Sequence, residues 1–164
     1  MLRVYLVAPR SDLEWVDSEV DAIASMDGLR VRLVRSPATL RGVTEKIERY
    51  GAGDILVFSA HGNGSGVVLD DGQIGITDIL MLVEASRCEL VILNSCTSVA
   101  IASQIVKRTR ASVIATIEEL PDRRAWQIST GFLREVVRGG TPLSAFQRTA
   151  AHDDNSIFLR SLIE

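Results

Sequence analysis

Short apolar runs alternate along the chain with segments in which apolar residues recur every three or four positions. Five of these runs are rich in β-branched residues, and they predict strands at residues 3–8, 29–34, 54–60, 89–94 and 111–117. The runs at 54–60 and 89–94 are apolar throughout their centres. Such continuous runs are typical of strands that are buried on both faces of a sheet.

The segments between these runs have the period of helices. In the first of them, Val16, Val20 and Ile23 form an apolar stripe, and Ser11 or Asp12 is the expected N-cap. Thr39 and Thr77 are the expected N-caps of the next two. The predicted helices lie at residues 11–26, 39–50, 77–86, 98–109, 121–137 and 142–151.

Two segments do not fit this alternation. Residues 67–69 and 73–75 flank Asp70-Asp71-Gly72, a combination that predicts a small hairpin. Residues 156–163 are apolar and fit either an edge strand or a terminal helical turn. Strands that alternate with helices predict an α/β fold with a mainly parallel sheet and right-handed crossovers. Because no internal repeat or linker interrupts the chain, residues 1–164 are expected to form a single domain.

Composition excludes several classes of protein. Hydrophobic residues make up 46% of the 164 residues, which is typical of a chain that forms a core. The net charge of −3 lacks the basic excess of a nucleic-acid binder, so no nucleic-acid partner is expected. No apolar run approaches the roughly 18 residues of a membrane span, and no signal peptide is evident, so no membrane partner is expected either. The two cysteines exclude a disulfide scaffold, and the expected location is the cytoplasm.

Two reactive residues directly follow predicted strands. His61 comes after residues 54–60, and Cys96 comes after residues 89–94. Ligands of open parallel sheets bind outside the carboxyl ends of the strands. If these two strands are neighbours, they lie about 4.8 Å apart, and imidazole and thiol can enter one crevice. A nearby imidazolium favours the reactive thiolate and can then protonate a leaving amine.

Backbone groups near Cys96 suit the same chemistry. A helix predicted near Ser98 places its positive end close to the sulfur, and its first N–H groups lack helical partners. Such groups can stabilise the oxyanion of a tetrahedral intermediate. Gly62 can supply a second donor because it has no side chain to obstruct a substrate.

Simpler interpretations stay open at this point. A cysteine at a strand end is commonly core filling, and a single histidine is commonly a polar residue with satisfied hydrogen bonds. Cys88 fits the first description, and His152 reads as a surface residue. The sequence G-N-G-S-G-V at residues 62–67 lacks the third glycine of a dinucleotide loop. No metal site is expected, because the two His and two Cys do not have zinc-ligand spacing.

The pattern of motifs resembles a known family. An apolar strand with His-Gly at 55–62, followed by an apolar strand with Ser-Cys at 90–96, is similar to the caspase-like, clan CD cysteine peptidases. Within these, the chain most resembles short, effector-type bacterial CHAT domains. The hairpin region at 67–72, the strand and helix at 111–137 and the closing segment at 139–146 extend the resemblance over nearly the whole chain.

The resemblance implies a caspase-like three-layer α/β/α sandwich with a small hairpin after the His loop. It implies His61 as general acid and base, Cys96 as nucleophile, and the N–H groups of Gly62 and Cys96 as the oxyanion hole. It further implies hydrolysis of peptide bonds in a protein or peptide substrate without a cofactor or metal. Because no sensor domain accompanies the predicted domain, a separate regulatory protein is expected as a partner.

Three functions remain at this stage. The first is a cysteine endopeptidase, with an effector role in bacterial stress or defence signalling by analogy with the family. The others are a non-catalytic caspase-like module that binds a partner, and a flavodoxin-like domain that binds a small ligand. Residues 156–163 could also offer a free edge strand for a homodimer.

A last expectation concerns substrate choice. If the strand at 111–117 neighbours that at 89–94, its carboxyl end lies beside Cys96, and Glu118, Glu119 and Asp122 follow it. A carboxylate in a partly desolvated pocket would favour Arg or Lys before the scissile bond. The alternative is that Asp122 only complements a helix N-terminus and that the two glutamates are solvated.

Overall fold

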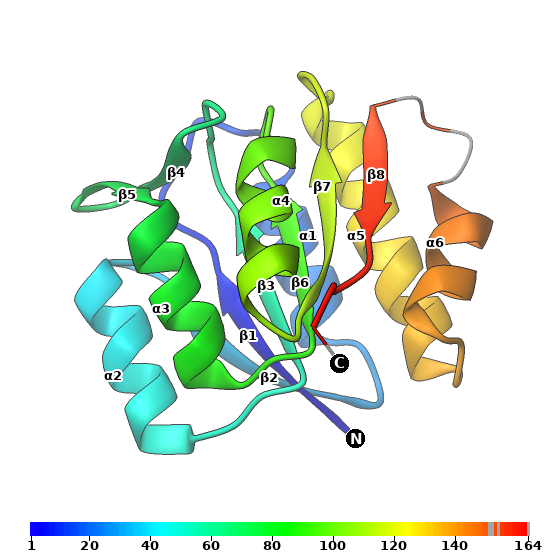
Figure 1. The fold of residues 1–164 in the computed structure, drawn as a ribbon, viewed down its shortest axis with the longest axis horizontal. Coiled ribbons are helices and arrows are strands. Elements are labelled where there is room, and N and C mark those ends of the chain that lie inside the picture. The colour runs from blue at the N-terminus through cyan, green and yellow to red at the C-terminus, as the bar shows by residue number, and fades with distance from the viewer. Residues whose placement is uncertain (151–152, 154, 164) are drawn as a thin grey trace.

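Six strands form one mainly parallel sheet in the computed structural model, which describes residues 1–150, 153 and 155–163 (Figure 1). His152, expected on the surface, lies outside the described residues. The strands lie in the order β2-β1-β3-β6-β7-β8, and β8 alone runs antiparallel to its neighbour. Their bounds are β1 (Leu2–Val7), β2 (Leu29–Val34), β3 (Ile55–Ser59), β6 (Leu90–Asn94), β7 (Ser112–Thr116) and β8 (Ser156–Leu159). The predicted α/β class is confirmed.

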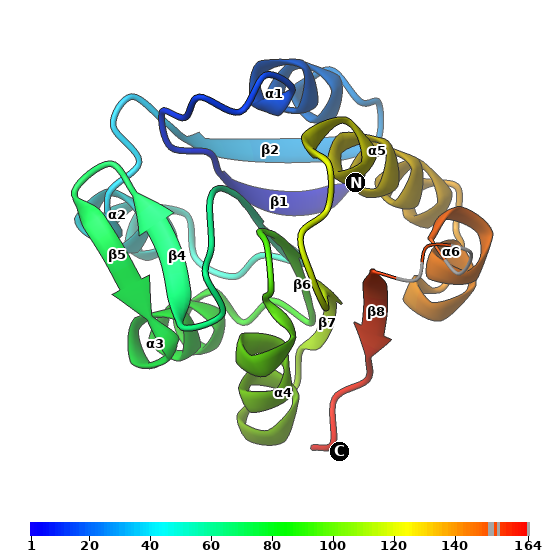
Figure 2. The same cartoon turned by 90° about the horizontal axis from the view of Figure 1, so that it is seen from above.

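Helices cover both faces of the sheet (Figure 2). One layer holds α1 (Val16–Ala24), α5 (Asp122–Val137) and α6 (Pro142–Thr149), and the other holds α2 (Leu40–Tyr50), α3 (Ile76–Ser86) and α4 (Val99–Arg108). Strand residues alternate between the two cores, since successive side chains of a strand point to opposite faces. In β3, for example, Leu56 and Phe58 pack toward α2, α3 and α4, whereas Ile55 and Val57 pack toward α1 and α5. The expected three-layer sandwich is therefore confirmed.

The predicted hairpin follows the glycine-rich loop after β3. It consists of the antiparallel strands β4 (Gly66–Leu69) and β5 (Gly72–Gly75). The Asp70 carboxylate at its turn accepts hydrogen bonds from the N–H groups of Arg10 and Ala38, at 2.9 and 2.6 Å. These bonds fix the hairpin to the loops that leave β1 and β2, at the same edge of the sheet as the predicted site.

Two predicted helix starts are wrong. Helix α1 begins at Val16, and Trp15 occupies its N-cap position without a side-chain cap, so neither Ser11 nor Asp12 caps it. Helix α3 begins at Ile76 with Gly75 at its N-cap position, so Thr77 is not the cap. The Thr39 cap of α2 is confirmed, because its Oγ1 accepts a hydrogen bond from the Gly42 N–H at 3.0 Å.

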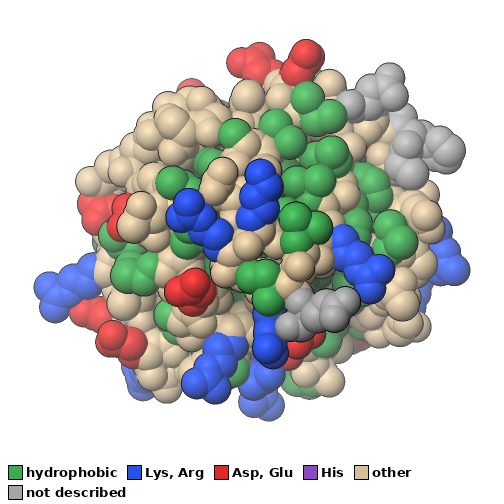
Figure 3. All heavy atoms as spheres, in the orientation of Figure 1, with side chains coloured by type: hydrophobic (Ala, Val, Ile, Leu, Met, Phe, Trp, Pro, Cys, Tyr) green, Lys and Arg blue, Asp and Glu red, His purple; other side chains and the backbone are tan. Residues whose placement is uncertain are grey.

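The ambiguous C-terminal segment is an edge strand. In β8, Ile157 and Leu159 pack against the core formed with α2, α3 and α4, and Ser156 pairs with Thr116 of β7. Hydrophobic side chains gather over β7 and β8 on the face seen in Figure 3. Ile117, which follows β7, and Leu162, which follows β8, are exposed. None of the helices in the described ranges is long and apolar enough to cross a bilayer.

Candidate active site

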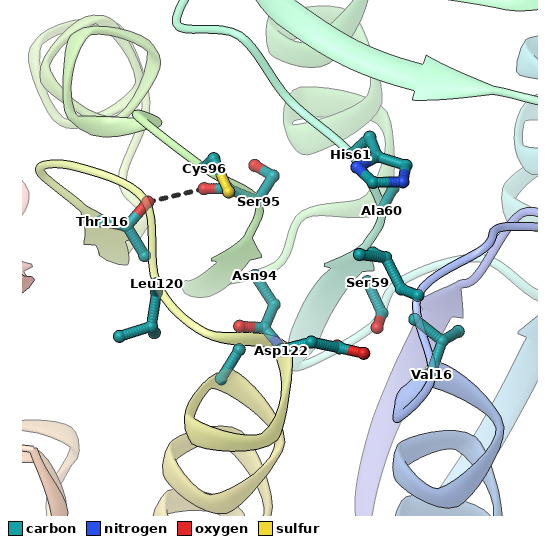
Figure 4. Close-up of a pocket in the computed structure, with 12 residues that line it drawn as sticks. Val16, Ser59, Ala60, His61, Asn94, Ser95, Cys96, Thr116, Leu120 and Asp122 are labelled. Carbon is teal, nitrogen blue, oxygen red and sulfur yellow. Dashed lines mark hydrogen bonds between the residues drawn. The ribbon is translucent and has the colours of Figure 1, made fainter.

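His61 and Cys96 lie just beyond the ends of two adjacent strands. Strands β3 and β6 are parallel neighbours, and their last register pair is Ser59 with Asn94. His61 and Cys96 each follow two residues later, so both emerge from the same edge of the sheet. Both line one pocket (Figure 4). The sheet order therefore provides the adjacency on which the sequence-based hypothesis depends.

The pocket lies between the ends of β3 and β6, the start of α1 and the start of α5. It is shallow: the cavity volume that water-sized molecules can occupy is about 30 Å³. Half of its twelve lining residues are polar and the rest are apolar or cysteine: Leu13, Val16, Ser59, Ala60, His61, Asn94, Ser95, Cys96, Thr116, Leu120, Asp122 and Ala125. Polar groups that converge on one pocket can orient a ligand.

A carboxylate holds the imidazole of His61. Nε2 of His61 lies 2.6 Å from Oδ1 of Asp12, in the loop between β1 and α1. The hydrogen bond from His61 lowers the pKa of the Asp12 carboxyl below its ordinary value. Because an ionised carboxylate only accepts, this contact fixes the proton of the neutral ring on Nε2. Nδ1 is then the acceptor available to a thiol.

The thiol of Cys96 and the ring of His61 face the pocket without direct contact. Within the described part of the chain, no hydrogen bond joins the two side chains. Catalytic hydrogen bonds are often long before substrate binds, so this spacing is compatible with a resting dyad.

The turn that carries Cys96 is tightly anchored. Thr97 has a left-handed backbone with a φ of 54°, and Ser98 occupies the N-cap position of α4. Thr116, at the end of β7, donates from Oγ1 to the Ser95 carbonyl at 2.6 Å and from its N–H to Ser98 Oγ at 3.0 Å. The anchored turn holds Cys96 two residues before the N-cap position of α4, the positive end of that helix.

Two backbone N–H groups next to these side chains have no acceptor within the described ranges. Among the described residues, neither the Gly62 N–H nor the Cys96 N–H has a hydrogen-bond acceptor. The Gly62 backbone also packs directly on the Cys96 turn: a Cβ at position 62 would lie 2.9 Å from Ser95 Cβ and 3.2 Å from the Cys96 carbonyl oxygen. Only glycine permits this close approach.

Comparison with known proteins identifies the family. A family model described as CHAT domain matches residues 6–152. The chain belongs to the CHAT domain family. A search of curated proteins gave no match. The solved structure of a secreted C11 cysteine protease from Bacteroides thetaiotaomicron, in complex with an irreversible peptide inhibitor, is similar at 12% identity and a TM-score of 0.63.

That match concerns the fold. It covers 90% of this CHAT domain, which spans 56% of the length of the C11 protease. The mainly parallel sheet flanked by helices is thus a caspase-like protease fold, as the resemblance implied. The residues described by the structure include no group of three or more His, Cys, Asp or Glu side chains arranged to hold a metal ion.

The second cysteine, Cys88, differs from Cys96 in its place on the strand and in its exposure. Cys88 precedes β6, at the end of the strand opposite to Cys96, and is only 3% exposed. Burial raises the pKa of its thiol to about 11. Since the thiolate is the nucleophile, burial makes Cys88 a poor nucleophile at neutral pH, whereas Cys96 is partly exposed and lines the pocket.

The three acids proposed for substrate binding lie in different environments. Asp122 lines the pocket from the first turn of α5, and its Oδ2 accepts a hydrogen bond from the Trp15 N–H at 2.6 Å. Glu118 and Glu119 are exposed on the loop after β7. Asp122 is therefore the one of the three that lines the pocket.

The sequence pattern does not predict two carboxylates near the site. It predicts Asp12 only as a helix cap, although Asp12 follows β1 at the sheet edge that also carries His61. Glu19 lies three residues after Val16 and four before Ile23, which places it on the apolar stripe of α1. A charged residue on a buried stripe is the signal that could have found it.

Proposed function

We propose that this CHAT domain is a cysteine endopeptidase that hydrolyses peptide bonds with Cys96 as nucleophile and His61 as general acid and base. The observation that carries the proposal is that both side chains reach one pocket from the ends of adjacent strands. The similar C11 protease, whose structure contains a peptide inhibitor, adds support from a shared fold.

The first half of the reaction breaks the peptide bond. Nδ1 of His61 removes the thiol proton, and the sulfur of Cys96 attacks the scissile carbonyl carbon. The oxyanion that forms accepts hydrogen bonds from the N–H groups of Gly62 and Cys96. The imidazolium then returns its proton to the leaving amine, which departs as the new N-terminus and leaves a thioester on Cys96.

The second half regenerates the enzyme. His61 takes a proton from water, and the resulting hydroxide attacks the thioester carbonyl. The tetrahedral intermediate collapses and expels the thiolate of Cys96, the carboxylic acid product departs, and the imidazolium returns its proton to the thiolate. Asp12 keeps the ring oriented through both halves, because its bond to Nε2 persists in the neutral and the protonated imidazole.

The substrate proposed is a protein or peptide with Arg or Lys before the scissile bond. Asp122 is the acid best placed to select it, since it lines the pocket, whereas Glu118 and Glu119 are exposed on the loop after β7. The competing role for Asp122 is local: it lies in the first turn of α5 and also accepts the Trp15 N–H. A peptide-library profile of the wild type and of Asp122→Asn, Glu118→Gln and Glu119→Gln distinguishes these roles.

A non-catalytic module that binds a partner is the second candidate. The observation that favours it is the absence, among the described side chains, of a hydrogen bond between His61 and Cys96. Because the chain belongs to the CHAT family, the flavodoxin-like domain is not proposed.

The biological part of the proposal is an effector role in bacterial stress or defence signalling, in the cytoplasm and under a separate regulatory protein. The open edge of β8 is proposed as the surface on which a second copy pairs, because an exposed apolar edge otherwise risks aggregation. Light scattering of the purified chain over a range of protein concentrations tests this dimer, and a mass that stays monomeric throughout contradicts it.

A peptidyl electrophile tests the enzymatic proposal directly. We expect mass spectrometry to find the label on Cys96 and not on Cys88. Cys96→Ala should abolish both labelling and hydrolysis, and His61→Ala should nearly abolish hydrolysis. Hydrolysis that persists unchanged in Cys96→Ala would exclude the proposed mechanism, and a folded wild type that neither labels nor cleaves would favour the partner-binding module.

A further inference from the structure

A buried carboxylate lies directly beneath the candidate active site. Glu19, in the middle of α1, is only 2% exposed. Its Oε1 accepts hydrogen bonds from Asn94 Nδ2, at 2.8 Å, and from Ser129 Oγ of α5. Its Oε2 accepts a hydrogen bond from Ser59 Oγ. One side chain therefore connects α1 with α5 and with the ends of β3 and β6.

The two strand residues that Glu19 holds are a matched pair. Ser59 and Asn94 are the last register partners of β3 and β6. Beyond them a single long bond, 3.4 Å from the Ala60 N–H to the Asn94 carbonyl, continues the backbone pairing. The strands then separate into the turns that carry His61 and Cys96. Glu19 is thus the side-chain connection at the point where the two strands part.

Packing alone does not account for a carboxyl at this position. Burial raises the pKa of Glu19, and the negative charge of Asp122 acts in the same direction. No Lys, Arg or His forms an ion pair with Glu19 among the residues that the structure describes. An apolar side chain on the stripe between Val16 and Ile23 would avoid this desolvation.

We propose that Glu19 is a positioning residue of the dyad: by holding Ser59 and Asn94 together it fixes the separation of His61 and Cys96. This inference rests on the proposed function, because it concerns the geometry of the same two catalytic groups. Glu19 itself does not reach the substrate, since Ser59 and Asn94 line the pocket in front of it.

The hydrogen-bond pattern indicates which substitutions separate geometry from charge. A glutamine can accept from Asn94 and Ser129 through Oε1, and it can donate from Nε2 to the Ser59 hydroxyl. Glu19→Gln therefore keeps the connection and removes the charge. Glu19→Leu fills a similar volume and removes the connection. Val20→Ala, one residue along α1 and 5% exposed, is the matched control for loss of core packing.

The test measures the alkylation rate of Cys96 by iodoacetamide as a function of pH, site by site with mass spectrometry. This readout requires no hydrolysis, and Cys88 in the same molecule is the unreactive reference. A thiol without its imidazolium has a pKa of about 8.5 and is only about 1% ionised at pH 6.5. We expect Glu19→Leu to lower the rate at pH 6.5 at least about tenfold and to move the profile toward a free thiol. Glu19→Gln and Val20→Ala should stay within about threefold of the wild type.

Each outcome decides the inference. The inference is overturned if the alkylation profile of Glu19→Leu equals that of the wild type. It is also overturned if Glu19→Gln is slowed as much as Glu19→Leu, because loss of the charge would then explain the slower alkylation. If Glu19→Leu does not fold, Ser59→Ala removes the β3 side of the connection, and an unchanged profile in that variant is equally contrary. A wild-type Cys96 that already titrates like a free thiol overturns the inference, because Glu19 then holds no resting dyad in place. If that wild type also fails to cleave peptide, the proposed function fails as well, so the two failures are distinguishable.

Discussion

Replacing Gly62 with alanine perturbs the dyad through the backbone alone. The new Cβ would lie 2.9 Å from Ser95 Cβ and 3.1 Å from Ser95 Oγ, about 0.5 Å short of ordinary van der Waals contact. The His61–Gly62 segment and the Ser95–Cys96 turn must therefore move apart. A misplacement of about 1 Å can reduce a rate about 100-fold, so we expect a loss of about tenfold in kcat/KM.

The stability of the Gly62→Ala variant should fall as well. Overpacking at a tight contact typically destabilises a protein by about 1–3 kcal/mol. Urea denaturation measures this change, and hydrolysis of a peptide substrate measures the activity. Gly75→Ala is the matched control, because a Cβ there has only the Ser65 carbonyl oxygen nearby, at 4.0 Å. We expect it to retain wild-type activity.

A second variant tests the cause. Ser95 Oγ is buried without a hydrogen-bond partner among the described residues, so Ser95→Gly removes the clashing atoms without breaking a hydrogen bond. The double variant Gly62→Ala/Ser95→Gly should recover part of the lost activity. Wild-type activity in Gly62→Ala, or no recovery in the double variant, would refute the reasoning that the close approach of these two turns sets the dyad.

Two further predictions concern the carboxylates. Asp12→Asn should lower kcat/KM only about two- to fivefold, because the Asp12 side chain is 91% exposed and exposed ion pairs contribute little. A pH–rate profile measures the change in kcat/KM, and a loss above about 100-fold would contradict this prediction. The raised pKa of Glu19 makes the folded state bind its proton more tightly than the unfolded state does. Its contribution to stability is therefore fully present below the ordinary glutamate pKa of about 4.3 and is lost as pH rises through the raised value. Glutamine does not titrate, so Glu19→Gln does not undergo this loss. Urea denaturation should therefore show the free energy of unfolding of Glu19→Gln rising relative to that of the wild type between pH 4 and pH 7. An unchanged difference between the two proteins would contradict the direction of the Glu19 pKa shift.

The strands, and the order in which the motifs follow them, were predictable from the sequence, because the apolar runs match the burial that the sheet imposes. The positions of β3 and β6 followed from runs such as Ile55–Ser59, in which every residue is buried. Helix starts were less predictable, because side chains that usually cap helices had other partners. Asp12, for example, binds His61 instead of the first turn of α1. A local sequence pattern does not indicate a hydrogen-bond partner that is distant in the sequence.

The carboxylates of the site follow from topology that local patterns do not contain. Because β1 lies beside β3, the loop after β1 passes the end of β3, and Asp12 meets His61 across 49 positions of sequence. The chain then enters α1, which packs on the same face as α5, so Glu19 and Ser129 meet across 110 positions. Both contacts depend on the order β1-β3-β6, in which three consecutive parallel strands end side by side. A single segment, the loop after β1 and the first half of α1, thus contacts both the imidazole of His61 and the side chain of Asn94, the last residue of the strand that precedes Cys96.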